Sequence, residues 1–345
     1  MSKKNKKKKH RTRRQIFRRV FFLSMLIFTL MGFGLLYAYN LLDKIESAEI
    51  PTNDKELGIK EDVFEDKKII NILLFGVDEK NSQHTGRSDS IMIATLDKQH
   101  KKIKLTSIMR DTYLDIPGKG MDKINHAYSI GGPELAIKTI NQNFDMNIRE
   151  YATVDFFGLE KIIDTLGGLE VNVKPNEVSF INNGVRNMNK LDGKNGKLLQ
   201  SSGNITLTGR QAVAYSRIRK TGNGDYERTE RQRIVLEKII NKGLNAGITK
   251  YPALLDAMLP YVETSLSKSE ILSYGTSVIT SGIKTIDKFR IPADGYVEDA
   301  RINGVSYVVP VELEDNVKIL HTFIYDDKKP EDEKSGTMNS NNNKN

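Results

Sequence analysis

The sequence predicts one α/β domain built around a central sheet and preceded by a single transmembrane helix. Three observations support this fold class. Short apolar runs, which are typical of buried strands, alternate with amphipathic stretches, which are typical of helices. One uncharged run near the N-terminus is long enough to cross a bilayer. The 345 residues include no cysteine, so the domain has to be stabilised by its own hydrophobic core.

The basic residues of the chain are concentrated at its N-terminus. The formal net charge is +9, yet residues 1–19 hold eleven Lys and Arg and no acid. Without these eleven, the chain carries 42 basic and 44 acidic residues. A basic protein often binds nucleic acid, but here the excess charge belongs to a tail. We therefore expect no nucleic-acid partner.

Residues 20–42 form the predicted membrane anchor. They hold 23 residues without a charge. As a helix this run would measure about 34 Å, enough for a hydrocarbon core of about 30 Å. A cleaved signal peptide is the alternative, but its apolar region is shorter and ends in small residues, which this run lacks. The basic flank predicts that residues 1–19 are a cytoplasmic tail, which makes the rest of the chain extracellular and the cell membrane a partner.

The stretch after the anchor is predicted to begin with a stalk. Residues 43–67 are charged and show no apolar period, so we interpret them as an extracellular stalk that leads to a domain over residues 68–326. Strands are predicted at 69–75, 91–96, 103–108, 151–155, 169–173, 287–292 and 305–310. Helices are predicted at 133–144, 156–166, 208–215, 225–244, 250–259 and 268–281.

Local signals support several of these bounds. Pro133 is suited to the first turn of a helix, and Gly167 with Gly168 is suited to the end of one. Ser267 and Glu270 have the spacing of a capping box.

Two polar segments are predicted to lie outside the helices and strands. Residues 176–205 are rich in Asn, Gly and Lys, and we interpret them as a long surface excursion. Residues 327–345 are polar and of low complexity, so we predict a disordered tail.

Common catalytic motifs are absent from the sequence. It contains no P-loop, no dinucleotide-binding fingerprint, no H-E-x-x-H and no G-x-S-x-G. Its five histidines are scattered without ligand spacing, which argues against a histidine zinc site and a Ser-His-Asp triad.

Two aspartates flank the first two predicted strands. Asp78 follows the first strand, and Asp89 immediately precedes the second. Open α/β sheets present ligand residues in loops at strand ends. Both carboxylates are therefore predicted to hold Mg²⁺ or Mn²⁺, ions that bind to one or two carboxylates and to substrate phosphates. The alternative is that each aspartate is an ordinary turn residue.

Basic residues accompany these carboxylates. Arg87 precedes Asp89, and Arg110 follows the third strand. Arg217 and Arg219 would point the same way if the chain there is extended. Together they predict an anion site, because arginine binds phosphate oxygens in pairs.

The helix predicted at 225–244 adds to this basic group. Arg228, Arg231 and Gln232 lie on one face near its N-terminus, where cations oppose the helix dipole. This arrangement suggests an external anion such as pyrophosphate. The alternative is a solvated basic face that is paired with Glu227 and Glu230.

Seven segments around these residues resemble the LytR-CpsA-Psr family of cell-envelope proteins. They occur in the family's order: Asn71–Asp78 (NILLFGVD), Arg87–Met92 (RSDSIM), Ser107–Asp111 (SIMRD), Lys123–Tyr128 (KINHAY), Asp164–Gly168 (DTLGG), Ala212–Arg219 (AVAYSRIR) and Asp225–Arg233 (DYERTERQR). The resemblance implies an α/β/α sandwich with a mostly mixed sheet that binds polyprenyl-pyrophosphate lipids. It also implies transfer of a linked glycopolymer, such as wall teichoic acid or capsule, to peptidoglycan through a phosphodiester bond, with a divalent metal.

The resemblance also implies roles for individual residues. Asp78 and Asp89 match the family's metal ligands, whereas Lys80 stands where the family often has arginine and lacks its forked donor. Pyrophosphate or head-group contacts are implied for Arg87, Lys123, Arg217, Arg219, Arg228 and Gln232. Catalytic roles are implied for Arg110, Arg217, Arg219 and Asp225. The helix at 156–166 could line a tunnel for the lipid tail or be ordinary core.

The implied reaction is a displacement at phosphorus. A sugar hydroxyl of peptidoglycan attacks the phosphate that carries the glycan, and polyprenyl phosphate leaves. Asp111 and Asp225 are candidates for the general base. Two other functions stay open, namely a non-catalytic envelope regulator or transcription attenuator, and a pyrophosphatase in which water replaces the sugar.

Overall fold

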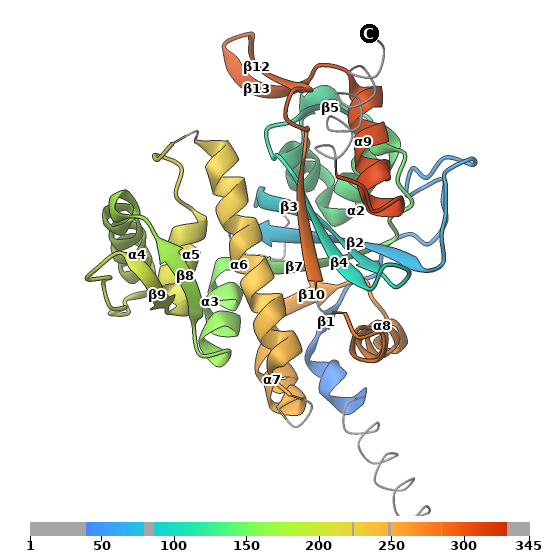
Figure 1. Cartoon of the computed structure of the whole chain (residues 1–345). Helices are drawn as coiled ribbons and strands as arrows, with labels where there is room; N and C mark the ends of the chain where they lie inside the picture. Colours follow the sequence, from blue (N-terminus) through green and yellow to red (C-terminus); the bar gives the residue numbers. More distant parts are fainter. Residues whose placement is uncertain (1–38, 79–85, 223, 248–249, 284, 330–345) are drawn as a thin grey trace, which may run out of the picture. The chain divides into compact units, whose positions relative to one another are not determined.

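The computed structural model describes residues 39–78, 86–222, 224–247, 250–283 and 285–329 (Figure 1). These residues divide into a short unit that ends at Lys44 and a main unit that starts at Ile45. The short unit contains a 3-10 turn, η1 (Leu42–Lys44). Within the described ranges, every helix is too short or too polar for a membrane span. Most of the predicted anchor, residues 20–38, the basic tail and Lys80 lie outside the described residues.

A seven-stranded mixed sheet is the centre of the main unit (Figure 1). The strand order is β1-β10-β7-β2-β3-β4-β11. β2 pairs antiparallel with β3 and parallel with β7, while β4 pairs parallel with β11. The predicted α/β class with a mixed central sheet is confirmed. The strand bounds are β1 (Glu46–Ser47), β2 (Ile69–Val77), β3 (Ser88–Asp97), β4 (Lys102–Ile108), β7 (Glu150–Asp155), β10 (Val262–Thr264) and β11 (Thr285–Ile291).

Helices and three separate hairpins complete the main unit. The helices are α2 (Ile124–Phe144), α3 (Phe156–Thr165), α4 (Val178–Asp192), α5 (Gly209–Ser216), α6 (Asp225–Asn245), α7 (Tyr251–Met258), α8 (Lys268–Thr280) and α9 (Leu313–Tyr325), with 3-10 turns η2 (Pro175–Glu177) and η3 (Leu259–Tyr261). The hairpins are β5 (Tyr113–Ile116) with β6 (Gly120–Lys123), β8 (Leu169–Val173) with β9 (Gly203–Leu207), and β12 (Val297–Ile302) with β13 (Val305–Pro310).

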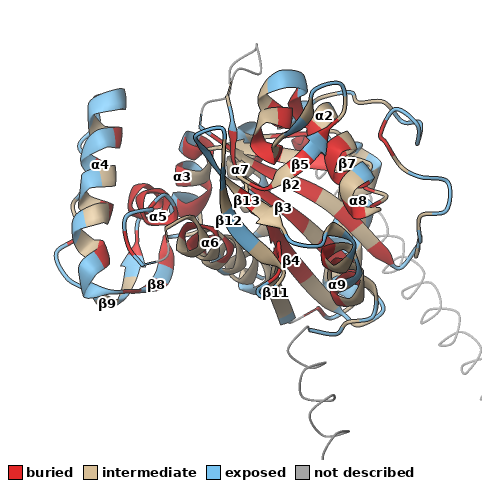
Figure 2. Ribbon diagram, turned by 90° about the horizontal axis from the view of Figure 1, so that it is seen from above, coloured by how far each residue is buried: buried red, intermediate tan, exposed pale blue. Residues whose placement is uncertain are grey.

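The two faces of the sheet are covered differently. Alternate residues of β2, among them Leu73 and Phe75, are buried, and they pack with α2 and α9 in the main core. The residues between them, such as Leu74, are half-buried and face a cavity that α3, α6 and α7 line. Figure 2 shows the red, buried part of the strands between these two layers of helices. The sheet therefore lies between two helical layers, and one of them is packed less tightly.

A second, smaller core corrects the interpretation of residues 176–205 as a surface excursion. Residues Val178–Asp192 form α4, in which Ile181, Val185 and Met188 are buried at helical spacing. α4 packs against α5. The two helices can approach closely because residue 184 is glycine, since a Cβ there would lie only 2.8 Å from the Cβ of Ala214. Of the polar residues that suggested a loop, Asn183, Asn187 and Lys190 lie on the exposed face of α4, which is pale blue in Figure 2. Asn182 and Asn189 face inward and form hydrogen bonds with the backbone of Leu199 and Gly196.

The helix predicted from Pro133 begins nine residues earlier. α2 starts at Ile124, and its path breaks at Gly131 and Gly132, whose backbone angles are not helical. Pro133 therefore opens the second stretch of α2, as its first-turn signal suggests. The other predicted helices agree with the structure to within about two residues, and the capping box of Ser267 with Glu270 is present.

Both ends of the domain extend beyond the predicted bounds. Leu57, in the range that we interpreted as a stalk, is completely buried in the main core, so part of residues 43–67 belongs to the domain. Asp327, at the start of the predicted disordered tail, forms ion pairs with Lys102 and Lys104. α9 was not predicted, and its buried residues also join the main core. Residues 330–345 lie outside the described residues.

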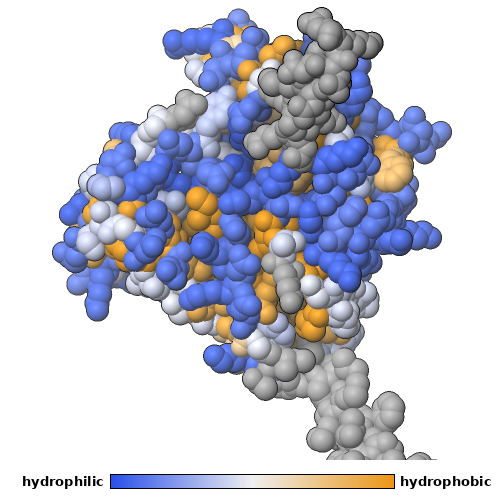
Figure 3. Space-filling view, viewed as in Figure 1, coloured by the Kyte–Doolittle hydropathy of each residue, from blue (hydrophilic) through white to orange (hydrophobic). Residues whose placement is uncertain are grey.

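The face of the main unit in Figure 3 is mostly hydrophilic. Hydrophobic side chains gather in its middle, beside the region that α6 and β11 occupy in Figure 1. α6 therefore borders apolar surface along part of its length.

Candidate functional site

Two carboxylates and one guanidinium meet where β2 ends and β3 begins. β2 and β3 are antiparallel neighbours, so Asp78, just after β2, lies beside Asp89. In the pairing of β3 with β4, Ile91 lies opposite Ile108. The same register, extended by two residues, sets Arg110 opposite Asp89, and these two side chains form an ion pair. Sheet register thus assembles three predicted site residues.

The end of α5 delivers two more arginines to the same carboxylates. Arg217 donates to Asp78 at 3.0 Å, and Arg219 donates to Asp89 at 3.4 Å. Ile218, between them, is buried in the smaller core and holds this segment in place. Arg217 has helical rather than extended backbone angles, so our reason for expecting both side chains on one side was wrong, although both do reach the site.

α6 contributes one buried arginine and one amide. Gln232 donates to the backbone oxygen of Asp89 at 3.3 Å. Arg228 is only 2% exposed and donates to Asp225 at 2.8 Å. Its Nε and Nη1 atoms have no hydrogen-bond partner among the described residues. A buried guanidinium with unused donors is costly, so this site suits an additional anion.

The charges in this cluster oppose one another. Burial lowers the pKa of Arg228 to about 10, and repulsion from Arg110 and Arg219 acts in the same direction, against the attraction of Asp225. Burial also raises the pKa of Asp78, as does the negative charge of Asp89. The carboxylates of Asp78 and Asp89 could hold a divalent cation, which would relieve their mutual repulsion.

The remaining predicted contacts lie at the rim of the cluster. Lys123 pairs with Asp111 at 3.1 Å. Arg110 lies 3.8 Å from Asp111 and from Asp225, so both general-base candidates border the arginines. Arg87 is exposed, and no ion pair joins it to another residue of the described ranges.

Arg231 does not belong to the site, although it shares a helix face with Arg228. It is buried and donates to Glu177 at 2.9 Å and to Glu227 at 2.6 Å. The predicted pairing with Glu227 is therefore confirmed for this arginine, but the solvated face of that alternative is wrong here, because Arg231 is 3% exposed. Arg233 likewise pairs with Glu230.

One other group of acids has its charge compensated. Asp97, His100 and Asp327 are close enough to share an ion. However, Lys104 lies 2.7 Å from Asp97 and 3.2 Å from Asp327. We therefore interpret this group as an ion-pair network.

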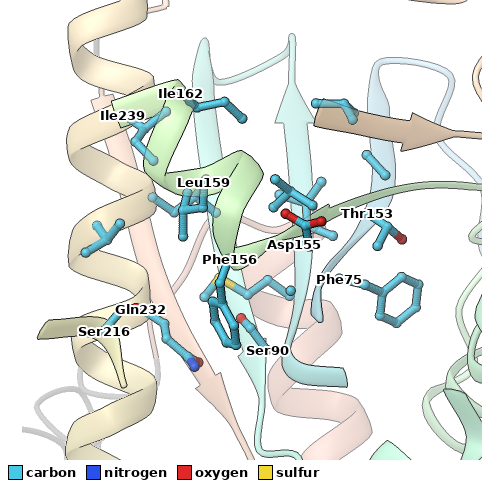
Figure 4. Close-up of a pocket in the computed structure, with 18 of the residues that line it drawn as sticks. Phe75, Ser90, Thr153, Asp155, Phe156, Leu159, Ile162, Ser216, Gln232 and Ile239 are labelled. Carbon is cyan, nitrogen blue, oxygen red and sulfur yellow. The ribbon is translucent and has the colours of Figure 1, made fainter. Parts of the chain in front are cut away.

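An apolar cavity of about 230 Å³ opens next to the charged cluster (Figure 4). Ser90, Ser216 and Gln232 lie at one end of it, and Ile162 and Ile239 lie at the other. Ser90 follows Asp89 and Ser216 precedes Arg217, so the polar end of the cavity adjoins the arginines and carboxylates. The arrangement suits an amphiphile with an anionic head and an apolar tail.

α3 lines this cavity with part of its apolar side. Phe156, Leu159 and Ile162 face the cavity, whereas Ile163 is buried in the smaller core and Phe157 is 38% exposed. The helix therefore lines a cavity with some of its apolar residues and packs in the core with others.

A polar cleft on the other side of the cluster was not predicted. It measures about 410 Å³ and lies between the start of α6 and the β12–β13 hairpin, with Asp111, Asp225 and Tyr226 in its lining. The signal for this hairpin was the two-residue turn Asn303-Gly304, where both residues have positive φ.

Comparison with known proteins gives a consistent match. The LytR_cpsA_psr family model matches residues 33–320. The regulatory protein MsrR of Staphylococcus aureus is 34% identical over 261 residues, 75% of each chain. The polyisoprenyl-teichoic acid–peptidoglycan teichoic acid transferase TagU of Bacillus mycoides is 32% identical over 301 residues, 81% of this chain and 93% of that protein.

Solved structures share the fold. The structure titled "TagT bound to LI-WTA" aligns with a TM-score of 0.63 and 26% identity, over 80% of this chain and 99% of that one. YwtF (TagT) from Bacillus subtilis, with bound octaprenyl pyrophosphate lipid, aligns with a TM-score of 0.59 and 25% identity over the same shares.

Proposed function

The chain belongs to the LytR-CpsA-Psr family, and from that premise we propose that it transfers a glycopolymer from a polyprenyl-pyrophosphate carrier to peptidoglycan through a phosphodiester bond. Relatives that are named teichoic acid transferases favour wall teichoic acid over capsule as the polymer. The observation that carries the proposal is the apolar cavity whose polar end adjoins Arg217, Arg219 and Arg228. An apolar tail joined to a diphosphate needs these two neighbouring environments.

The arginines bind and neutralise the diphosphate. Arg228 has two unused donors and is almost completely buried, and charge stabilisation is strongest away from water. Arg110 and Arg219 approach the same volume from β4 and α5, so the anion is held from three elements. Gln232 stands between this head-group site and the cavity.

The reaction forms one oxygen–phosphorus bond and breaks another. A peptidoglycan hydroxyl attacks the phosphate that bears the glycan, polyprenyl phosphate leaves, and the proton passes to Asp111 or Asp225. Asp78 and Asp89 would hold Mg²⁺ or Mn²⁺, which would supply charge neutralisation at the phosphate oxygens. The N-terminal anchor would keep this extracellular site near its lipid substrate.

Analysis of reaction products by mass spectrometry tests the proposed function. With a lipid-linked donor and a peptidoglycan acceptor, we expect a glycan–peptidoglycan phosphodiester and polyprenyl phosphate. Glycan phosphate formed equally with and without acceptor would indicate a pyrophosphatase instead. Absence of turnover with intact donor binding would favour the regulatory role that the name of MsrR suggests.

Replacing Asp78 with Asn is expected to abolish the stabilisation of the fold by added Mg²⁺. The pKa of Asp78 is raised in the folded state, so the protonated Asp78 carboxyl stabilises the fold. This stabilisation is fully present below the unfolded pKa and is lost as the pH rises through the folded pKa. Without metal at pH 7, Asp78→Asn should therefore unfold at or above the wild-type temperature. Added Mg²⁺ should raise the unfolding temperature of the wild type and have little effect on the variant.

The exposed Asp115 on β5 provides the control for this comparison. Asp115→Asn should respond to Mg²⁺ as the wild type does. Equal stabilisation of Asp78→Asn and wild type by Mg²⁺ would remove Asp78 from the metal site.

A further inference from the structure

α6 arranges three environments in a line. Tyr226 and Asp225, at its start, border the polar cleft, Arg228 follows in the charged cluster, and Leu236 lies in the apolar cavity. At 1.5 Å per residue, Tyr226 and Leu236 are about 15 Å apart along the helix. The cleft and the cavity therefore adjoin opposite sides of the arginines.

This order matches the requirement of phosphoryl transfer. The attacking and leaving oxygens lie roughly in line, on opposite sides of the phosphorus atom. If polyprenyl phosphate leaves on the side of the cavity, the attacking hydroxyl has to arrive from the side of the cleft. Asp111 and Asp225, which could accept its proton, both line the cleft.

The walls of the cleft are fixed by contacts between distant segments. The Tyr226 hydroxyl donates to Asp299 on β12 at 3.3 Å, which joins α6 to the hairpin. The backbone N–H of Val308 on β13 donates to the backbone oxygen of Asp111 at 2.9 Å. The ring of Tyr307 packs on Tyr113 with 4.7 Å between centroids. The cleft is thus a built feature of the fold.

The lining of the cleft suits the hydroxyl and amide groups of a sugar chain. Carboxylates accept hydrogen bonds from hydroxyl and amide groups, and tyrosine offers an apolar ring with a polar tip. The charged residues of the lining are three aspartates, Asp111, Asp225 and Asp299, and one arginine, Arg301. The cleft therefore offers the phosphates of the donor chain fewer cationic contacts than the arginine cluster does. Arg228, nearly buried with unused donors beside Asp225, shows that the cleft leads to a site that is incomplete without an anion.

We propose that this cleft, between the start of α6 and the β12–β13 hairpin, is the subsite for the acceptor glycan of peptidoglycan. The proposal rests on the proposed function for the identity of the acceptor. Asp299 and Tyr307 hold the sugar chain, and the attacking hydroxyl lies toward Asp111 and Asp225. As its oxygen bonds to phosphorus, its proton moves to one of these carboxylates and polyprenyl phosphate departs.

The test uses the full chain in detergent, a lipid-linked donor and glycan strands stripped of their peptides. Asp299→Ala is expected to raise the KM for the acceptor about tenfold, the loss of one hydrogen bond to a charged group. The KM for the donor should stay at the wild-type value. Tyr307→Ala should act in the same direction.

Glu298→Ala is the matched control. Glu298 precedes Asp299 on β12, so its side chain points to the other face of the hairpin, and it does not line the cleft. Equal acceptor KM values for Asp299→Ala and Glu298→Ala would overturn the proposal. A raised KM for the donor in Asp299→Ala would also overturn it, because the cleft would then hold the donor glycan.

Direct binding separates this inference from the proposed function. Binding of the stripped glycan strands to the protein without donor can be followed by saturation-transfer NMR. Suppose that the wild type binds the strands, that Asp299→Ala does not, and that neither protein transfers glycan. The subsite would then stand, and the proposed function would fall. If transfer occurs but the substitution changes neither binding nor acceptor KM, the subsite falls alone.

Discussion

Replacing Asp89 with Asn is expected to lower the rate of glycopolymer transfer by about 10²–10³-fold, the usual loss on removal of one preorganised charge contact. Asp89 is buried, and the guanidinium groups of Arg110, Arg219 and Arg228 all point to it. The substitution removes the charge that orients them and one of the two proposed metal ligands. Steady-state release of polyprenyl phosphate from a lipid-linked donor measures the effect.

Asp97 provides a control on the same strand. It lies at the other end of β3, is also buried, and pairs with Lys104 at 2.7 Å. Asp97→Asn should cost stability, because buried Lys104 loses the nearer of its two charged partners, while the folded fraction keeps the wild-type rate. Transfer by folded Asp89→Asn at close to the wild-type rate would refute the assignment of Asp89.

Replacing Arg228 with Met is expected to change activity and stability in opposite directions. Transfer should fall about 10²-fold, because the diphosphate loses a buried forked donor. The free energy of unfolding without substrate should stay equal or rise. Removing Arg228 abolishes the burial cost that lowers its pKa to about 10, and Asp225 keeps Arg110 and Arg219 at 3.8 and 3.9 Å. Denaturant unfolding and donor turnover measure the two effects.

Arg231→Met is the matched control, one turn further along α6. Arg231 is 3% exposed, but its donors are satisfied by Glu177, Glu227 and Thr221. Its removal leaves the buried carboxylate of Glu177 without its charged partner and should cost about 3–5 kcal/mol of stability. The folded fraction should turn over donor normally. A larger loss of stability in Arg228→Met than in Arg231→Met would contradict our account of the site.

Much of the fold was predictable because local patterns suffice for local structure. The apolar run that forms β2 and the amphipathic period of α6 each fix an element type without reference to the rest of the chain. The misses have equally local causes. The Asn and Lys residues of α4 concealed three buried residues at helical spacing, and the polar sequence of β12, VEDARI, concealed a strand.

The sequence by itself predicted the candidate site residues at the ends of the strands. Asp78, Asp89 and Arg110 lie at the ends of adjacent strands in chain order, so antiparallel pairing was enough to bring them together. Only the tertiary structure decided which arginines reach the candidate site. Arg228 and Arg231 share a helix face, and they differ because Glu177, from a distant segment, lies opposite Arg231 alone.

The same distinction holds for the cavity and the cleft. The apolar side of α3 was evident from its sequence, but whether Leu159 and Ile162 fill a core or line a cavity depends on how closely α6 and α7 approach. The cleft exists because the β12–β13 hairpin docks on Asp111 and meets Tyr226. The spacing of apolar residues in the sequence predicts which way a side chain points on its own helix or strand. What lies opposite that side chain is decided by the packing of segments that are far apart in the chain.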